Sequence, residues 1–136
     1  MEFRIIDANL NRLNEALRVI EDVNRLKLNN KSLTSKIKRI RHSIQKFSKK
    51  YYFNLLESRD TKKDLGKFLN FKSEFKRKDI KDVLAANFKR IEESCRVLEE
   101  ILKIDEPEYS AIFKEIRFKT YYIEKKTILE IIKSEK

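Results

Sequence analysis

Residues 8–22 read ANLNRLNEALRVIED, and residues 86–100, which begin 78 positions later, read ANFKRIEESCRVLEE. Both copies follow the pattern A-N-x-x-R-x-x-E-x-x-R-V-[IL]-E-[DE], with apolar residues at matching positions between the shared polar ones. A weaker echo follows each copy, KRIR at 38–41 and KEIR at 114–117. A hydrophobic core needs only apolar residues at helical spacing. The repetition of the same Asn, Arg and Glu residues therefore indicates that these polar groups have a function.

The composition favours one helical domain. The chain has 136 residues, of which 40% are charged and 40% hydrophobic, with a single Gly and a single Pro. A chain of this length is expected to fold as one domain with a sizeable core, and so few helix breakers predict long helices. One cysteine excludes an internal disulfide, and the chain shows neither a secretory signal nor an apolar run of 18 residues. We therefore expect a cytoplasmic protein that does not span a membrane.

Four amphipathic stretches predict four helices. In each of them apolar residues recur at spacings of three and four, which marks one helical stripe. The stripes consist of Ile6, Leu10, Leu13, Leu17 and Ile20; Leu33, Ile37, Ile40, Ile44, Phe47 and Tyr51; Leu84, Phe88, Ile91, Cys95, Leu98 and Leu102; and Tyr109, Phe113, Ile116, Thr120 and Ile123. Ser32 and Asp79 are the expected N-caps of the second and third helices. Pro107 fits the first turn of the fourth helix, where its missing N–H is harmless.

The order of these helices predicts the fold class. Helix, short turn, helix, a longer link, then helix, short turn, helix is typical of an all-α four-helix bundle made of two duplicated helical hairpins. We expect a single domain over residues 1–136, with repeat halves at about 1–56 and 79–133 related by a pseudo-two-fold axis. Residues 57–78 form the linker loop between the halves. A loop of that length in a compact bundle is often functional.

The net charge of +11 is concentrated in the middle of the chain. Residues 31–80 hold 16 basic and 5 acidic groups, whereas the segments before and after them are each balanced. A field of this kind favours anionic partners, such as phosphorylated small molecules, nucleic acid or a membrane surface. A solvated, lysine-rich surface explains the same charge without any ligand.

On a helical wheel the repeated polar residues occupy distinct positions. Asn9 lies on the apolar side of the first helix and Arg12 lies on its flank. Glu15 and Arg18 lie on the far face. The same layout recurs in the third helix for Asn87, Arg90, Glu93 and Arg96. In a single copy, Glu15 and Arg18 would be read as a weak solvated pair and Asn9 as a buried amide that sets register. Two copies with the same geometry favour a role in binding or catalysis.

The linker contains the sequence SRDTKKDLG at 58–66, in which two carboxylates lie four residues apart among cations. Asp60 and Asp64 are candidate ligands of Mg²⁺, which takes one or two protein carboxylates together with phosphate oxygens. Arg59 is a candidate for neutralising phosphate charge. An ordinary polar connection has the same composition. A single Gly excludes a P-loop, and one Cys with one His excludes a zinc cluster.

Four segments resemble a small family of thiamine biosynthesis: RIIDANLNR at 4–12, EALRVIED at 15–22, SRDTKKDLG at 58–66 and ANFKRIEESCRVLEE at 86–100. That family occurs alone or fused to the front of thiamine-phosphate synthase. The resemblance to its stand-alone form implies a monofunctional hydroxymethylpyrimidine-phosphate kinase. Such an enzyme phosphorylates 4-amino-5-hydroxymethyl-2-methylpyrimidine phosphate to the diphosphate, with ATP and Mg²⁺ as cofactors. Thiamine-phosphate synthase is then a candidate partner.

Most of the repeated polar residues fall on the motif positions of this family. These positions are Arg4, Asp7, Asn9, Arg12, Glu15, Arg18, Arg59, Asp60, Asp64, Gly66, Asn87, Arg90, Glu93, Arg96 and Glu99. Asp7 has no counterpart in the second copy, where Ala85 stands. If the site is asymmetric, Asp7 marks its chemical half.

Phosphoryl transfer requires positioning and charge neutralisation, and from this we assign expected roles. The catalytic candidates are Arg18, Arg96, Glu15, Glu93 and Asp7. The candidates for substrate and phosphate binding are Arg4, Asn9, Arg12, Arg59, Asn87 and Arg90. Those for the metal are Asp60 and Asp64, with Glu15 and Glu93 as the alternative pair. Arg18 and Arg96 are expected to hold the substrate phosphate and the ATP tail.

Three alternatives stay open at this point. A nucleic-acid-binding helical domain would use residues 31–80, although the repeated glutamates argue against it. Another small all-α enzyme acting on anionic metabolites, of the chorismate mutase sort, would use Arg and Glu without nucleotide or metal. A structural partner domain would bind no ligand. A homodimer is compatible with each of these interpretations.

Overall fold

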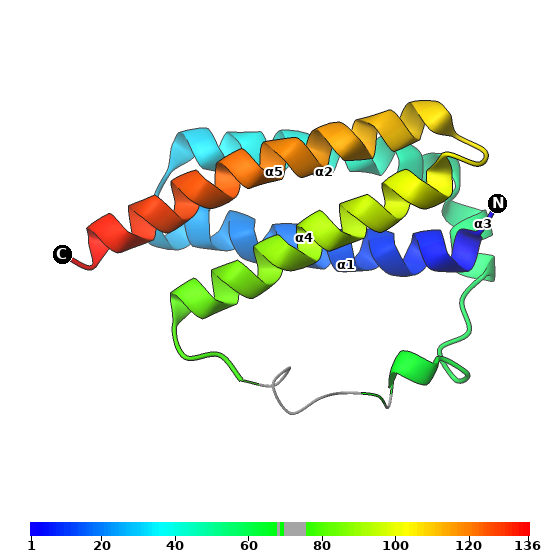
Figure 1. The fold of residues 1–136 in the computed structure, drawn as a ribbon, viewed down its shortest axis with the longest axis horizontal. Helices are drawn as coiled ribbons and strands as arrows, with labels where there is room; N and C mark the ends of the chain where they lie inside the picture. Colours follow the sequence, from blue (N-terminus) through cyan, green and yellow to red (C-terminus); the bar gives the residue numbers. More distant parts are fainter. Residues whose placement is uncertain (68, 70–75) are drawn as a thin grey trace.

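The part of the chain that the structure describes folds into five α-helices. We describe a computed structural model in residues 1–67, 69 and 76–136. The helices are α1 (Phe3–Asp22), α2 (Lys31–Lys50), α3 (Tyr52–Glu57), α4 (Ile80–Leu102) and α5 (Pro107–Ser134), with a π-helical turn at Val23–Lys27 and a 3-10 turn at Leu65–Lys67 (Figure 1). No strand occurs in the described part of the chain. The prediction of an all-α fold is confirmed.

The four long helices form two hairpins that pack on each other. α1 and α2 make the first hairpin, α4 and α5 the second, and α4 lies against α1 in the opposite direction (Figure 1). The predicted stripes meet inside, since every stripe residue of α1 and α4 is buried, as are those of the second and fourth stripes apart from the partly buried Tyr51 and Tyr109. Cys95 takes its expected place in this core, and burial raises the pKa of its thiol to about 12. The apolar spacing in the sequence therefore determines which face of each helix points inward.

The helix starts follow capping chemistry. Asp79 caps α4 as predicted, because its carboxylate accepts the backbone N–H of Asp82 at 2.9 Å. Ser32 was the wrong cap for α2, which begins one residue earlier, at Lys31. The side chain of Asn30 accepts the Leu33 N–H at 2.9 Å and so takes the capping position.

The second predicted helix is divided at Tyr51. α2 ends at Lys50, and Tyr51 has a non-helical φ of −113° before α3 begins. The Tyr51 hydroxyl donates to the Glu106 carboxylate, and Lys50 forms an ion pair with the same group at 3.4 Å. This hydrogen bond raises the pKa of Tyr51. The end of the first hairpin is thus attached to the start of α5.

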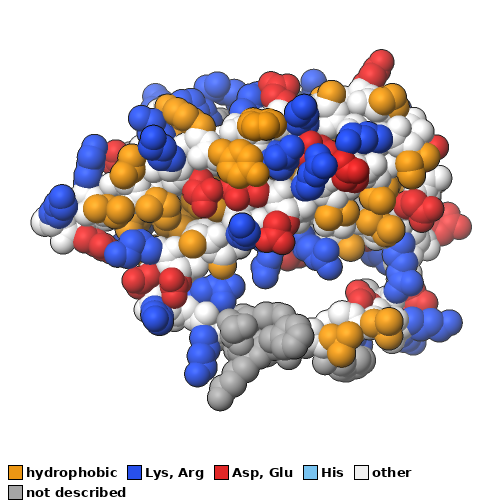
Figure 2. All heavy atoms as spheres, in the orientation of Figure 1, with side chains coloured by type: hydrophobic (Ala, Val, Ile, Leu, Met, Phe, Trp, Pro, Cys, Tyr) orange, Lys and Arg blue, Asp and Glu red, His pale blue; other side chains and the backbone are white. Residues whose placement is uncertain are grey.

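The segment that directly follows α3 leads away from the bundle of helices. Figure 2 shows open space between part of this segment and the helices. The predicted linker at 57–78 begins at the last residue of α3, and its residues 68 and 70–75 lie outside the described residues. The division into repeat halves stays a prediction.

Candidate functional site

Each hairpin contains the same buried ion pair between its two helices. In the first hairpin Glu21 of α1 accepts a hydrogen bond from Arg41 of α2 at 2.8 Å. In the second, Glu99 of α4 accepts two from Arg117 of α5, at 2.5 and 3.0 Å. Both glutamate side chains are almost fully buried, with 3% and 2% exposed. The glutamates are repeat-related, and the arginines close the weaker echo KRIR and KEIR, so duplication explains the match.

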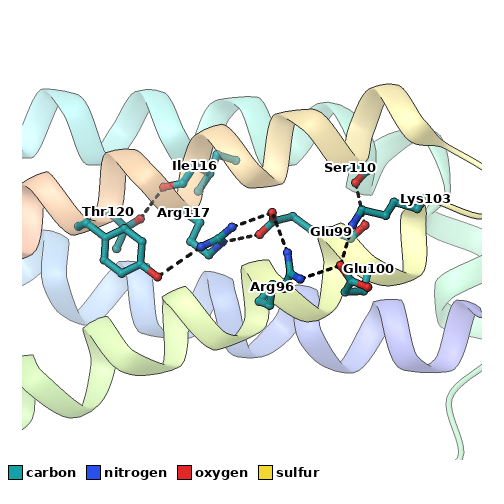
Figure 3. A network of polar contacts seen from close by, with 9 residues as sticks. Arg96, Glu99, Glu100, Lys103, Ser110, Ile116, Arg117 and Thr120 are labelled. Carbon is teal, nitrogen blue, oxygen red and sulfur yellow. Dashed lines mark hydrogen bonds and ion pairs between the residues drawn. The ribbon is translucent and has the colours of Figure 1, made fainter.

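The buried glutamates also attract the two arginines that were first choice for phosphate binding. Arg18 lies 3.6 Å from Glu21, and Arg96 lies 3.8 Å from Glu99 and 3.0 Å from Glu100. Figure 3 shows the guanidiniums of Arg96 and Arg117 converging on Glu99. The weak solvated pairs with Glu15 and Glu93, which a single copy of the repeat would have suggested, are not what forms here: the partner of each arginine is the buried carboxylate one turn further along the helix.

These contacts identify a structural role for much of the repeat. The Glu99 hydrogen bonds raise the pKa of Arg117, which therefore stays charged. A buried carboxylate needs such a partner, because an unpaired buried charge is strongly destabilising. Sequence analysis overlooked Arg41 and Arg117 as members of the set. The echo KRIR and KEIR was the signal that could have identified them.

A third ion pair fastens the segment after α3 to α1. Arg59 donates to both carboxylate oxygens of Asp7, at 2.7 and 3.0 Å, and this hydrogen bonding raises the pKa of Arg59. Arg4 donates to the backbone oxygen of Asp60 at 3.4 Å. Asp7 is buried, whereas its repeat counterpart Ala85 is exposed. Four predicted site residues, Arg4, Asp7, Arg59 and Asp60, therefore share one cluster, in which Asp7 anchors the chain leading to the linker.

The predicted metal ligands engage in local turns. An Asp60 carboxylate oxygen accepts the Lys63 N–H at 3.3 Å, and an Asp64 oxygen accepts the Gly66 N–H at 2.9 Å. Both residues lie in the connection and are at least partly exposed. Across residues 1–67, 69 and 76–136, no group of three or more His, Cys, Asp or Glu side chains is placed to hold a metal ion. Their role as Mg²⁺ ligands stays a prediction.

A pocket of about 420 Å³ opens between α1 and α4. It is lined by Asn9, Arg12, Ala86, Lys89, Arg90, Glu93, Ser94 and Val97. Four of these residues were predicted to belong to the site: Asn9, Arg12, Arg90 and Glu93. Lys89 and Ser94 were not. We call this hollow the α1–α4 pocket.

The α1–α4 pocket carries an excess of positive charge. Its three cations, Arg12, Lys89 and Arg90, are exposed at their helix surfaces. Within the described residues no carboxylate forms an ion pair with any of them, in contrast to Arg41 and Arg117. Among the described residues that line the pocket, Glu93 supplies the single carboxylate. A concave site whose cations have no protein partner is suited to an anionic ligand.

The repeat relates the two sides of this pocket. Arg12 and Arg90 are counterparts in the two copies, and both line the same hollow. Asn9 lies beside them, with its amide nitrogen donating to the Ile5 carbonyl at 2.9 Å. Its counterpart Asn87 makes the equivalent bond to Val83 at 2.8 Å. Asn87 and Glu15, the counterparts of Asn9 and Glu93, are not among the described lining residues. The pocket is therefore lined by Asn9 and Arg12 of the first copy and by Arg90 and Glu93 of the second.

Comparison with known proteins places the chain in a family. The sequence profile of the ThiD2 family matches residues 4–126. The chain belongs to the ThiD2 family. The matched region includes both copies of the repeat and every residue of the α1–α4 pocket.

Curated relatives of this ThiD2 family chain are named thiamine-phosphate synthase. The protein from Nostoc punctiforme is 43% identical over 122 residues, which make up 90% of this chain and 34% of the relative. Those from Synechocystis and Rhodopirellula baltica are 38% and 39% identical, over 89% and 87% of the chain and 34% and 32% of their own lengths. The chain thus spans about a third of the relatives it matches. These comparisons support a role in thiamine biosynthesis.

No solved structure matches this ThiD2 family chain. Among its described helices, none combines the length and apolar character needed to cross a bilayer.

Proposed function

We propose that this protein phosphorylates 4-amino-5-hydroxymethyl-2-methylpyrimidine phosphate to the diphosphate, using ATP and Mg²⁺. The observation that carries the proposal is the α1–α4 pocket, where the repeat-related Arg12 and Arg90 and the neighbouring Lys89 form no ion pair with a carboxylate of the residues that the structure describes. Membership of the ThiD2 family supports thiamine biosynthesis as the pathway in which this reaction takes place. Phosphoryl transfer needs positioned cations more than covalent chemistry, and this pocket supplies them.

The proposed roles differ from those expected from the sequence alone. Arg12 and Arg90 bind phosphate oxygens, and Lys89 neutralises the additional charge of the nucleotide tail. Arg18 and Arg96 support the fold around the site through Glu21 and Glu99. The amide nitrogen of Asn9 is engaged by Ile5, so we assign its side-chain oxygen to the pyrimidine amine.

The donor set of the pocket is compatible with ATP and Mg²⁺. Mg²⁺ usually keeps several waters and takes one or two protein carboxylates plus phosphate oxygens. Glu93 provides one carboxylate, and Asp60 or Asp64 of the connection is the candidate for a second. When bound, the metal would neutralise charge on the phosphates. The chain's own residues orient the two substrates.

This site is expected to discriminate against the unphosphorylated alcohol. Without the substrate phosphate, one of the two arginines would lack its anion in a partly desolvated site, and that loss weakens binding strongly. Association with thiamine-phosphate synthase is also proposed, on the ground that relatives bearing that name contain the matching region within a longer chain.

The test is diphosphate formation by the purified protein with ATP, Mg²⁺ and the pyrimidine phosphate. We expect Arg12→Ala and Arg90→Ala each to lower kcat/KM by about 100-fold, since hydrogen bonds to charged groups contribute about 1.5–3 kcal/mol. Arg25→Ala is the matched control, because Arg25 is exposed and pairs only weakly with Asp22 at 3.7 Å. Turnover that is absent in the native protein, or equal in all variants, would contradict the proposal.

A further inference from the structure

A second hollow lies between α2 and α5, in the layer away from the α1–α4 pocket. It has a volume of about 320 Å³ and is lined by Lys36, Arg39, Ile40, Ser43, Ile116, Lys119, Tyr122 and Ile123. Its floor consists of Ile40, Ile116 and Ile123, which are buried. We call it the α2–α5 groove. Its size and apolar floor are those of a small-molecule site.

The rim of the α2–α5 groove is cationic and aromatic. The Lys36 ammonium lies 5.0 Å from the centre of the Tyr122 ring. Over the described residues, neither Lys36 nor Arg39 takes part in an ion pair, and Lys119 pairs with the exposed Glu115 at 2.9 Å. The groove thus combines an apolar floor, an exposed ring and two cations without a carboxylate partner.

The duplication provides an internal comparison for this groove. The echo KRIR and KEIR relates Ile40 to Ile116 and Arg39 to Glu115. The repeat-related hollow is lined by Ser43, Lys46, Lys50, Glu106, Glu108, Tyr109, Ile112, Glu115, Ile116 and Lys119. Three glutamates balance the cations there, whereas none of the described residues that line the α2–α5 groove is acidic. The two hollows have diverged in charge, and of the two the α2–α5 groove is the one whose lining suits an anion.

We propose that the α2–α5 groove binds a small aromatic molecule that carries a phosphate. The ring would lie on the isoleucine floor beside Tyr122, and the phosphate would be held by Arg39 and Lys36. An apolar floor without the cations would accept neutral rings, and the cations alone would accept any anion. Their combination in one groove requires both properties in the ligand. The site is separate from the α1–α4 pocket and does not depend on the proposed kinase reaction.

The experiment is a titration of the ¹⁵N-labelled protein with phenyl phosphate, followed by the backbone amide signals in NMR spectra. We expect shifts at residues 36–43 and 116–123, with an affinity at least tenfold higher than for inorganic phosphate or benzyl alcohol. Shifts confined to residues 9–16 and 86–97, or equal responses to phenyl phosphate and inorganic phosphate, would overturn the proposal.

Variants locate the binding. Arg39→Ala and Tyr122→Ala are each expected to weaken phenyl phosphate binding about tenfold. Lys46→Ala, in the repeat-related hollow, and Arg90→Ala, in the α1–α4 pocket, are the controls and should leave it unchanged. A loss with Lys46→Ala as large as with Arg39→Ala would indicate a diffuse basic surface and overturn the assignment. Because no step requires ATP turnover, failure of the kinase assay leaves this test intact.

Discussion

The two hairpins share their internal ion pairs but differ where they meet the rest of the molecule. Glu21 with Arg41 and Glu99 with Arg117 are the same construction in two copies. Asp7, which holds the connection through Arg59, corresponds to Ala85 in the second copy of the repeat. The repeated residues thus hold the two helices of each hairpin together. Asp7, which has no counterpart in the second hairpin, attaches the connection to the first hairpin alone.

A second difference concerns a buried carboxyl group. Glu92 of α4 is 8% exposed and stands where α1 has the partly buried Asn14. Burial, reinforced by hydrogen bonding with Glu124 of α5, raises the pKa of Glu92 to about 8. One Glu92 carboxylate oxygen has no hydrogen-bond partner in the described part of the chain. The second hairpin therefore carries a proton-sensitive position that the first hairpin does not have.

The largest effect is expected from breaking the shared ion pairs. Glu21→Ala and Glu99→Ala should each lower the free energy of unfolding by about 3 kcal/mol, because each leaves a largely buried arginine without its partner. Urea denaturation measures this. The double variant Glu99→Leu with Arg117→Leu should lose less than Glu99→Ala, since it removes both charges. Unequal losses in the two hairpins would show that the copies are not equivalent.

The next effect depends on pH. In the unfolded chain Glu92 titrates near 4.5, and in the folded chain its pKa is about 8. The folded state therefore holds the proton more tightly, and stability is lost as pH rises between these values. From pH 6 to pH 8 the free energy of unfolding should fall by about 2 kcal/mol more in the native protein than in Glu92→Asn, which carries the residue of the first copy. If the free energy of unfolding changed with pH to the same extent in the native protein and in Glu92→Asn, this role for Glu92 would be ruled out.

A smaller effect is expected for the attachment of the connection. Asp7→Ala removes both hydrogen bonds to Arg59, whose side chain is 43% exposed, so the expected loss is about 1 kcal/mol. Hydrogen exchange should accelerate at residues 58–60, which α1 would no longer hold. Asp60→Ala is the control, because its carboxylate makes only a local turn contact. If hydrogen exchange at residues 58–60 were unchanged in Asp7→Ala, the ion pair between Asp7 and Arg59 would not be what holds this segment.

The smallest effects are expected at the exposed pairs of the two hairpins. Asp22 lies 3.7 Å from Arg25, and its counterpart Glu100 lies 2.7 Å from Lys103. The Lys103 hydrogen bond, together with Arg96, lowers the pKa of Glu100. Solvent screening makes such pairs weak. Asp22→Asn and Glu100→Gln should leave the denaturation midpoint within error of the native value, and a clear shift in either would reveal a coupled network.

Sequence reasoning recovered the helices well because apolar spacing reports directly which face is buried. Every stripe position of α4 is fully buried. Of the predicted site residues, Asn9, Arg12, Arg90 and Glu93 meet in one pocket, and their role in a site stays a prediction. A helical wheel cannot show which neighbouring helix covers a flank. Glu21 was therefore absent from the predicted site residues although Arg41 of α2 pairs with it, and Arg18 was assigned to phosphate although it lies near that carboxylate.

The burial of Cys95 gives the chain a built-in reporter of its own opening. The thiol is the single one in the sequence, lies in the middle of α4 and is fully buried. With a pKa of about 12 it is protonated and hidden in the closed protein, so a thiol-specific reagent reacts only when this region opens. The labelling rate of unmodified protein therefore follows how often the second hairpin separates from the first, and a bound ligand should slow it.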